Sequence, residues 1–144
     1  MILFCDTSAL VKLYLQEPFS QEVKALLAQC DNVAVSRVAW AEAIAALSRR
    51  AREEPSDAAV ITAAKQALQQ DWPHYVVLEV SQPIVEQAGE FADAFSLRAY
   101  DAVQLASAAH IAKVAQTEVT FACFDVRLSK AARLLAMHAP FPVF

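Results

Sequence analysis

Glycine is nearly absent from this sequence of 144 residues and occurs only at Gly89. Apolar residues make up 57% of the chain, and this composition excludes a disordered or low-complexity protein. Alanine and leucine are frequent enough to favour a mostly helical structure. The length fits one domain, residues 1–144, and a domain of this size folds without the help of disulfides.

Long hydrophobic runs are missing as well. Charged residues interrupt each apolar stretch well before the roughly 18 residues that a membrane span needs. The N-terminus has neither a charged segment nor a cleavage site, so we expect no signal peptide and a cytoplasmic protein that does not contact membranes. Cys5, Cys30 and Cys123 lack the spacing of a metal site, and buried reduced thiols fit a cytoplasmic protein best.

Positive charge is also scarce, and the net charge is −4. A protein that binds nucleic acid chiefly by neutralising phosphates would be basic, so this balance counts against a general nucleic-acid binder. It does not exclude a nuclease with an acidic metal pocket, because bound cations reverse the local charge. Two local basic clusters are present, and solvated helix faces explain both most simply. They comprise Arg49, Arg50 and Arg52, and Arg127, Lys130 and Arg133.

Short apolar runs alternate with helical periodicity along the chain. Strands are expected at residues 2–5, 33–35, 75–80 and 119–124, with a strand-like segment at 141–144. Helices are expected at residues 7–16, 20–28, 36–53, 56–71, 82–95, 99–115 and 126–137, with Ser36 and Ser56 as N-caps of two of them. The alternation predicts an α/β fold: a parallel central sheet of four to five strands, flanked by helices on both faces.

Acidic residues lie near the carboxyl ends of the expected strands, where ligands bind in open α/β sheets. Asp6 directly follows the first strand, and Asp125 follows the fourth. Glu42 lies about two turns into the helix after the second strand, and Asp101 lies near the start of the helix before the fourth. Asp6 and Asp125 are therefore expected at the same edge of the sheet. Glu42 and Asp101 reach this edge if their helices start there.

Helix capping is the competing explanation for three of these acids. Asp6, Asp101 and Asp125 lie near helix N-termini, where Asp stabilises the helix by about 0.5–2 kcal/mol. Taken singly, each fits a cap better than a metal ligand. Glu42 has no such explanation, because the run around it is apolar on all sides. A lone buried carboxylate is costly unless it is paired or bound to a metal.

Four acids at one sheet edge would repel one another until a cation compensates their charge. Mg²⁺ or Mn²⁺ suits a site made only of carboxylates. The three histidines, His74, His110 and His138, are scattered, so no histidine and cysteine set competes and zinc is not expected. The pattern therefore predicts a magnesium or manganese site built by the four acids.

Four short motifs in this chain resemble one protein family. They are CDTSALVKLY at residues 5–14, SRVAWAE at 36–42, LRAYDAVQLA at 97–106 and FDVRLSKAA at 124–132. Together, and in this order, they resemble the PIN-domain family, specifically the VapC-type toxins of bacterial toxin–antitoxin pairs, over the whole chain. Two departures stand out. Cys123 replaces the Thr or Ser that members often have two residues before the last acid, and the usual late glycine is missing near Ala136.

The resemblance implies a metal-dependent endoribonuclease that hydrolyses RNA phosphodiester bonds as the toxin of a toxin–antitoxin pair. The family's catalytic and metal-binding acids correspond here to Asp6, Glu42, Asp101 and Asp125. Its small hydroxyl residues near the site correspond to Thr7 or Ser8 and to Ser36. The resemblance also implies Mg²⁺ or Mn²⁺ as cofactor, an RNA substrate, a homodimer and a cognate antitoxin that blocks the acidic pocket, often with a basic side chain.

Two other functions stay open at this point. An aspartyl-nucleophile phosphatase would use a carboxylate after the first strand, such as Asp6. Enzymes similar to haloacid dehalogenases usually have a second Asp two residues later, where this chain has Ser8. A PIN-like binding module without catalysis would need no metal, so Mg²⁺ affinity distinguishes it from a nuclease.

Overall fold

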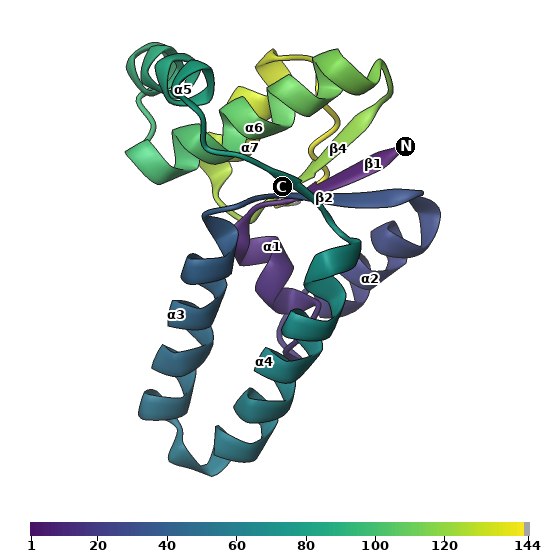
Figure 1. The fold of residues 1–144 in the computed structure, drawn as a ribbon, viewed down its shortest axis with the longest axis vertical. Coiled ribbons are helices and arrows are strands. Elements are labelled where there is room, and N and C mark those ends of the chain that lie inside the picture. Colours follow the sequence, from purple (N-terminus) through teal and green to yellow (C-terminus); the bar gives the residue numbers. More distant parts are fainter. Residues whose placement is uncertain (143–144) are drawn as a thin grey trace.

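The central sheet contains four strands in the computed structural model, which describes residues 1–142 (Figure 1). These strands are β1 (Ile2–Cys5), β2 (Asn32–Ser36), β3 (Val76–Leu78) and β4 (Val119–Ala122). All neighbouring pairs are parallel, and the strand order is β3-β2-β1-β4. Because parallel strands need crossover connections, helical segments join them.

Helices cover both faces of this sheet. Those below it in Figure 1 are α1 (Thr7–Lys12), α2 (Ser20–Gln29), α3 (Ala39–Glu53) and α4 (Ala58–Asp71). Those above it are α5 (Gln82–Phe95), α6 (Ala99–Ala115) and α7 (Val126–Leu134). A 3-10 turn at Pro55–Asp57 joins α3 and α4 into a hairpin that projects away from the sheet. The predicted α/β fold with helices on both faces is confirmed.

Each face of the sheet has its own hydrophobic core, and β1 contributes to both. Successive side chains of a strand point to opposite faces. Phe4 therefore stacks on Phe121 of β4, with ring centroids 5.6 Å apart, in the core beneath α5, α6 and α7. Leu3 packs in the other core, between the sheet and helices α1, α3 and α4. Because β1 is buried on both sides, it is fixed at the centre of the fold. Asp6, the residue that follows β1, is therefore held in place as well.

Most expected elements are found, and the differences lie at their ends. α5 and α6 have the predicted bounds. The expected N-cap roles of Ser36 and Ser56 are wrong. Ser36 is the last residue of β2, because it pairs with Leu78 of β3, and α3 begins only at Ala39. Ser56 lies inside the 3-10 turn, and α4 begins at Ala58.

The C-terminal segment differs most from the expectation. Phe141 and Pro142 lie outside any strand, and residues 143–144 lie outside the described residues. One parallel bridge joins Thr120 to His138. α7 ends at Leu134, and Ala136 then adopts a left-handed conformation with φ 64°. This is the place of the late glycine that the resemblance leads one to expect, and a glycine would adopt that conformation at lower cost.

Two further sequence predictions concern cysteines and membranes. Cys5 and Cys123 are buried, as predicted, whereas Cys30 is only partly buried, and all three cysteines are free thiols. Within residues 1–142, no helix has the length and apolarity that a membrane span requires.

Candidate active site

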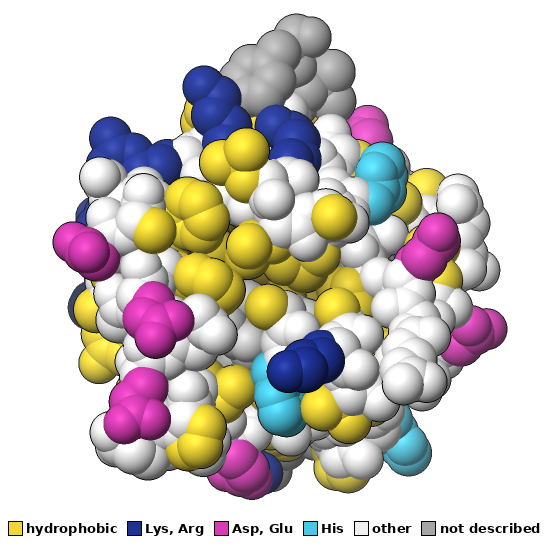
Figure 2. Space-filling view, turned by 90° about the horizontal axis from the view of Figure 1, so that it is seen from above, with side chains coloured by type: hydrophobic (Ala, Val, Ile, Leu, Met, Phe, Trp, Pro, Cys, Tyr) yellow, Lys and Arg dark blue, Asp and Glu magenta, His cyan; other side chains and the backbone are white. Residues whose placement is uncertain are grey.

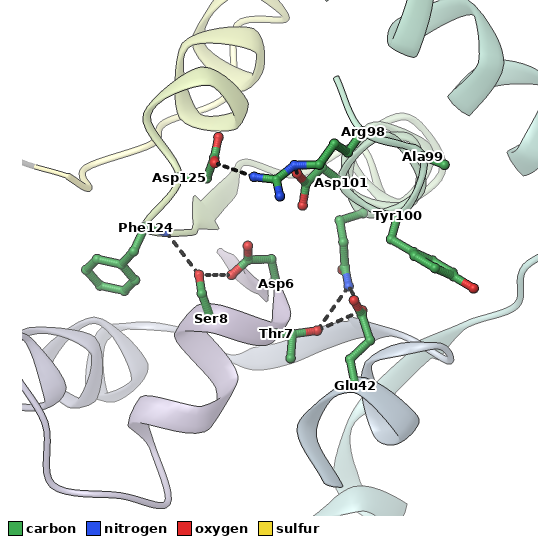
Figure 3. A pocket seen from close by; sticks show the side chains of 11 residues that line it. Asp6, Thr7, Ser8, Glu42, Arg98, Ala99, Tyr100, Asp101, Phe124 and Asp125 are labelled. Carbon is green, nitrogen blue, oxygen red and sulfur yellow. Dashed lines mark hydrogen bonds and ion pairs between the residues drawn. The ribbon is translucent and has the colours of Figure 1, made fainter. Parts of the chain in front are cut away.

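A pocket of about 540 Å³ opens at the carboxyl ends of β1 and β4, beside the first turns of α1, α3 and α6. All four predicted acids line it: Asp6, Glu42, Asp101 and Asp125. Figure 3 shows their side chains facing this pocket from four different segments. The structure therefore brings the four acids together. Their role as metal ligands stays a prediction.

Asp6 is the most deeply buried of the four acids, with 6% of its surface exposed. Its Oδ1 accepts hydrogen bonds from the hydroxyl of Ser8 (2.7 Å) and the backbone N–H of Ala9 (3.0 Å). Burial raises the pKa of Asp6 to about 7, although these two hydrogen bonds oppose the rise. The negative charges of Asp101 and Glu42 raise the pKa further. Asp6 forms no ion pair with a cationic side chain among residues 1–142.

Glu42 is held by two hydrogen bonds to the same oxygen. Its Oε1 accepts from the hydroxyl of Thr7 (2.8 Å) and from Nε2 of Gln104 (3.0 Å). The expectation of a helix buried on all sides around Glu42 is wrong. Glu42 is half-buried, and Ala41 and Ala45 are exposed, because alanine is small enough to lie on a solvated face. Glu42 also lies in the first turn of α3, since that helix starts later than expected.

Asp101 and Asp125 share one cation, the guanidinium of Arg98. Arg98 Nε lies 3.7 Å from Asp101 Oδ2, and its Nη2 lies 3.8 Å from Asp125 Oδ2 (Figure 3). Arg98 is 86% exposed, so solvent weakens both ion pairs. Burial and the nearby charge of Asp125 raise the pKa of Asp101, and Arg98 opposes that rise.

Two of the three aspartates cap helices, as the competing explanation predicted, and both of them also line the pocket. Asp6 caps α1 through the N–H of Ala9, and Asp125 caps α7 through the N–H of Leu128 (2.8 Å). Each cap uses only Oδ1, so the second carboxylate oxygen is not needed for it. Asp101 makes no cap, because Arg98 occupies the N-cap position of α6.

The predicted hydroxyl residues fall into two groups. Thr7 and Ser8 line the pocket. Ser8 also accepts a hydrogen bond from the N–H of Phe124 (3.1 Å), which joins the start of α1 to the segment after β4. Ser36 is buried at the end of β2 and is not part of the pocket lining among the described residues. Ser36 accepts only a long hydrogen bond from the N–H of Val38 (3.4 Å).

Cys123 keeps a hydrogen bond at the position where the resembled family often has Thr or Ser. Its Sγ lies 2.9 Å from the hydroxyl of Ser129 on α7. Burial raises the pKa of Cys123 to about 12, so the group stays a neutral thiol. The substitution therefore retains a link between the end of β4 and α7.

Two pocket residues that carry strongly polar side chains, Arg98 and Gln104, were not singled out from the sequence. Gln104 is only 2% exposed, and its Oε1 has no hydrogen-bond partner among the described residues. Its spacing carried a usable signal. A residue three positions after Asp101 lies on the same helix face, and Gln104 is the polar residue in the otherwise apolar run AVQLA.

The donor chemistry of the pocket fits a hard divalent cation. All four acids offer oxygen, which Mg²⁺ and Mn²⁺ prefer, and Asp6 combines burial with an uncompensated charge. Within residues 1–142, no three acidic, histidine or cysteine side chains already surround one point closely enough to hold a metal ion. A cation would therefore have to draw the carboxylates of this pocket toward itself.

Comparisons with known proteins agree with this fold. The family model of the PIN domain matches residues 3–134. Ribonuclease VapC45 of Mycobacterium tuberculosis (strain CDC 1551 / Oshkosh) is 35% identical over 107 residues, which are 74% of this chain and 74% of that protein.

Two solved structures share the fold at lower identity. VapC20 of Mycobacterium tuberculosis, a toxin that cleaves the Sarcin-Ricin loop, has a TM-score of 0.64 at 24% identity and covers 90% of this chain and 94% of its own. A toxin–antitoxin complex from Klebsiella pneumoniae has a TM-score of 0.58 at 21% identity and covers 83% of this chain and 84% of its own. Because the family model spans most of its length, the chain belongs to the PIN domain family.

Proposed function

We propose that this chain is a Mg²⁺- or Mn²⁺-dependent endoribonuclease that hydrolyses RNA phosphodiester bonds as the toxin of a toxin–antitoxin pair. The observation that carries the proposal is the meeting of four acids from distant segments in one pocket. The chain is also 35% identical to a ribonuclease, VapC45. A shared fold alone would not support an activity, whereas a pocket with matching chemistry does.

The four acids have different roles in this proposal. Asp6, Glu42 and Asp101 hold one divalent cation, and Asp125 helps to hold a second one or orients the attacking water. The bound metal supplies a water of lowered pKa and stabilises the charge that develops on the attacking and leaving oxygens.

Side chains and backbone of this chain orient the acids before the metal binds. Ser8 and the N–H of Ala9 fix one oxygen of Asp6. Thr7 fixes one oxygen of Glu42, and the N–H of Leu128 fixes one oxygen of Asp125. Each contact limits the rotation of a carboxylate and leaves its other oxygen for the metal, which reduces the entropy lost on binding.

The surroundings of the pocket suit a single-stranded RNA. Tyr100 lines the pocket and is 64% exposed, so its ring is available for a base to stack on. Arg98 and two further basic residues, Arg127 and Lys130, line an adjoining pocket that shares Asp101 and Asp125 with the first. Figure 2 shows Lys and Arg side chains gathered at one edge of the face that is seen from above. Such groups would contact the RNA backbone on one side of the cleaved bond.

An antitoxin partner and a homodimer complete the proposal. The related structure from Klebsiella pneumoniae is a toxin–antitoxin complex. Asp101 and Asp125 are partly exposed, so an arginine of a partner could pair with them and close the pocket. We expect sedimentation to give the mass of two chains. We also expect the co-expressed product of an adjacent gene to bind the protein and suppress its cleavage.

The direct test is RNA cleavage by the purified protein. With Mg²⁺ or Mn²⁺ present, we expect cleavage of a single-stranded RNA, its loss in EDTA and its return when the metal is restored. Asp101→Asn should lose cleavage, whereas Asp93→Asn on the exposed surface of α5 should retain it. Full activity in EDTA would contradict the metal role. Metal binding without cleavage of any RNA would favour a non-catalytic binding module.

A further inference from the structure

Gln104 is a buried polar residue of the pocket. Neither the sequence motifs nor the proposed mechanism assigns a role to it. We infer that Gln104 is a positioning residue: its amide fixes one oxygen of Glu42 and leaves the other free for the divalent cation that draws the carboxylates of the pocket together. The inference rests on the metal site proposed above. In the metal-free protein, Gln104 already limits the rotation of the Glu42 carboxylate.

Three helices meet through the hydrogen bonds of this group. Gln104 on α6 donates from Nε2 to Glu42 Oε1 on α3 at 3.0 Å. Thr7 at the start of α1 donates to the same oxygen at 2.8 Å, and Gln104 Nε2 also lies 3.4 Å from the Thr7 hydroxyl. Figure 3 marks the hydrogen bond between Thr7 and Glu42 with a dashed line. Both donors therefore bind one carboxylate oxygen, and Oε2 stays available for the cation.

The charge of Glu42 determines which way the amide of Gln104 points. The NH₂ group can donate to the carboxylate, whereas the amide oxygen would meet it as a second acceptor and be repelled. The observed orientation is therefore the favourable one. Its consequence is that Gln104 Oε1 points to a buried place where residues 1–142 offer it no donor.

An unpaired buried carbonyl lowers the stability of a protein. Gln104 lies in a buried stretch of α6, between Val103 and Leu105, where a leucine of similar size would pack without that cost. Packing therefore does not explain the glutamine. Its contact with Glu42 does, because an apolar residue could not donate a hydrogen bond to the carboxylate.

Gln104→Leu is the decisive variant, measured by Mn²⁺ titration calorimetry and by thermal unfolding without metal. We expect Mn²⁺ to bind about tenfold more weakly, as is typical when a residue that orients a metal ligand is lost. We expect the metal-free protein to unfold at the same or a higher temperature. A lower unfolding temperature with unchanged Mn²⁺ affinity would assign Gln104 a purely structural role and overturn the inference.

Gln87→Leu is the matched control. Gln87 donates from Nε2 to Glu90 Oε2 at 3.1 Å on α5, outside the pocket, so it has the same kind of contact without the site. This variant should bind Mn²⁺ as the wild type does. If Gln104→Leu does not fold, Gln104→Met provides a flexible apolar side chain of similar volume, with the same expected results.

A double-mutant cycle tests whether Gln104 acts through Glu42. In a Glu42→Ala background, adding Gln104→Leu should cause no further loss of Mn²⁺ affinity, because the side chain that it orients is gone. A second tenfold loss in that background would overturn the inference. A wild type that binds no Mn²⁺ would overturn the proposed function as well, whereas a wild type that binds Mn²⁺ equally to Gln104→Leu would overturn only the role of Gln104.

Discussion

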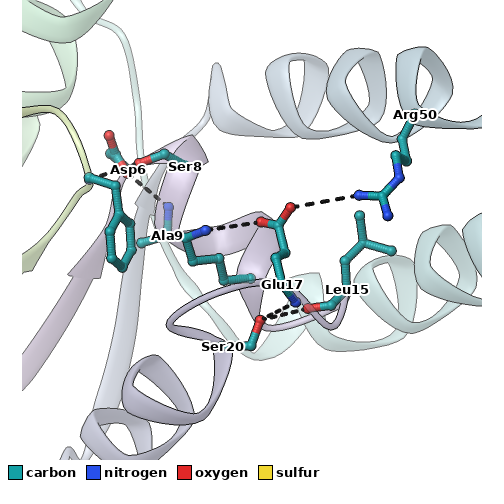
Figure 4. Close-up of polar contacts among 9 residues, drawn as sticks. Asp6, Ser8, Ala9, Leu15, Glu17, Ser20 and Arg50 are labelled. Carbon is teal, nitrogen blue, oxygen red and sulfur yellow. Dashed lines mark hydrogen bonds and ion pairs between the residues drawn. The ribbon is translucent and has the colours of Figure 1, made fainter. Parts of the chain in front are cut away.

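Two carboxylates beyond opposite ends of α1 have different electrostatic surroundings, which Figure 4 shows side by side. Glu17 lies between two cations, with Lys12 Nζ at 3.2 Å and Arg50 Nη1 at 4.0 Å. Asp6 is more deeply buried, yet it has hydrogen bonds from Ser8 and Ala9 and no cationic partner among residues 1–142. The chain thus supplies cations of its own to Glu17 but none that pairs with Asp6 among residues 1–142.

Lys12 makes the contrast sharper. Its ammonium lies 4.7 Å from the centroid of the Phe124 ring, and Phe124 lines the acidic pocket. A lysine is therefore present close to the pocket, but its ion pair is with Glu17. We propose that Glu17 and its partners serve the structure, whereas the pocket acids serve binding. The predictions below test this division.

The largest expected effect comes from removing the charge of Asp6. Asp6→Asn should weaken Mn²⁺ binding and slow RNA cleavage by at least about 100-fold, because a proposed metal ligand is lost. The metal-free variant should be as stable as the wild type or more stable, because a buried charge without a cationic partner is removed. Titration calorimetry, a cleavage assay and urea denaturation measure the three quantities. Normal Mn²⁺ affinity in this variant would contradict the proposed difference between Asp6 and Glu17.

The pH dependence of metal binding should follow the raised pKa of Asp6. This pKa is about 7 in the folded protein, against about 3.9 in an unfolded chain. Between these values the folded state binds the extra proton, so Asp6 makes the metal-free protein less stable as the pH rises from about 4 to 7. Mn²⁺ must displace that proton, and its affinity should fall about tenfold per pH unit below 7.

Asp6→Asn is the control for the pH prediction. The pH-dependent change that Asp6 causes in the stability of the metal-free protein should disappear in this variant. Urea denaturation of both proteins across this pH range measures the difference. An Mn²⁺ affinity of the wild type that stays constant from pH 7 to pH 5 would contradict the assignment.

Glu17 should behave in the opposite way to Asp6. Glu17→Gln leaves Lys12 without its carboxylate in a half-buried place, so we expect the free energy of unfolding to fall by about 1–2 kcal/mol. Mn²⁺ affinity should not change, because Glu17 is not part of the pocket lining among the described residues. Urea denaturation and Mn²⁺ titration check both statements. A weaker Mn²⁺ affinity would show that the two regions are not independent.

The smallest effect is expected at Arg98. Its guanidinium lies beside Asp101 and Asp125 but is highly exposed. Arg98→Ala should therefore strengthen Mn²⁺ binding by about threefold at low salt, and high salt should remove the difference. Arg49→Ala is a suitable control, because Arg49 pairs with Glu53 on the exposed surface of α3. Weaker binding by Arg98→Ala would mean that this arginine supports the site.

The features of the site that could be predicted are those that depend on neighbouring residues in the sequence. Apolar runs predicted the end of β1 at Cys5 correctly and placed the end of β4 at residue 124 instead of Ala122, which was still close enough to infer that Asp6 and Asp125 lie at one sheet edge. The bounds of α5 and α6 were also predicted correctly. The start of α3 was missed, since the pairing of Ser36 with Leu78 prolongs β2.

Contacts between distant segments could not be predicted in the same way. The hydrogen bond from Gln104 to Glu42 joins residues 62 positions apart and depends on how the starts of α6 and α3, which lie on opposite faces of the sheet, come together at its edge. The place of Arg98 beside Asp125 depends on the approach of α6 to the end of β4. Whether a carboxylate meets a cation of its own chain, as Glu17 does and Asp6 does not, is likewise a property of the packed structure.

Anomalous scattering from crystals of the wild-type protein soaked in Mn²⁺ tests most directly whether the pocket takes its cation from outside. We predict an anomalous peak from an Mn²⁺ ion held by the carboxylates of Asp6, Glu42 and Asp101, and no peak beside Glu17. A map without a peak in this pocket, or with Mn²⁺ bound only elsewhere on the surface, would contradict the division between the two regions.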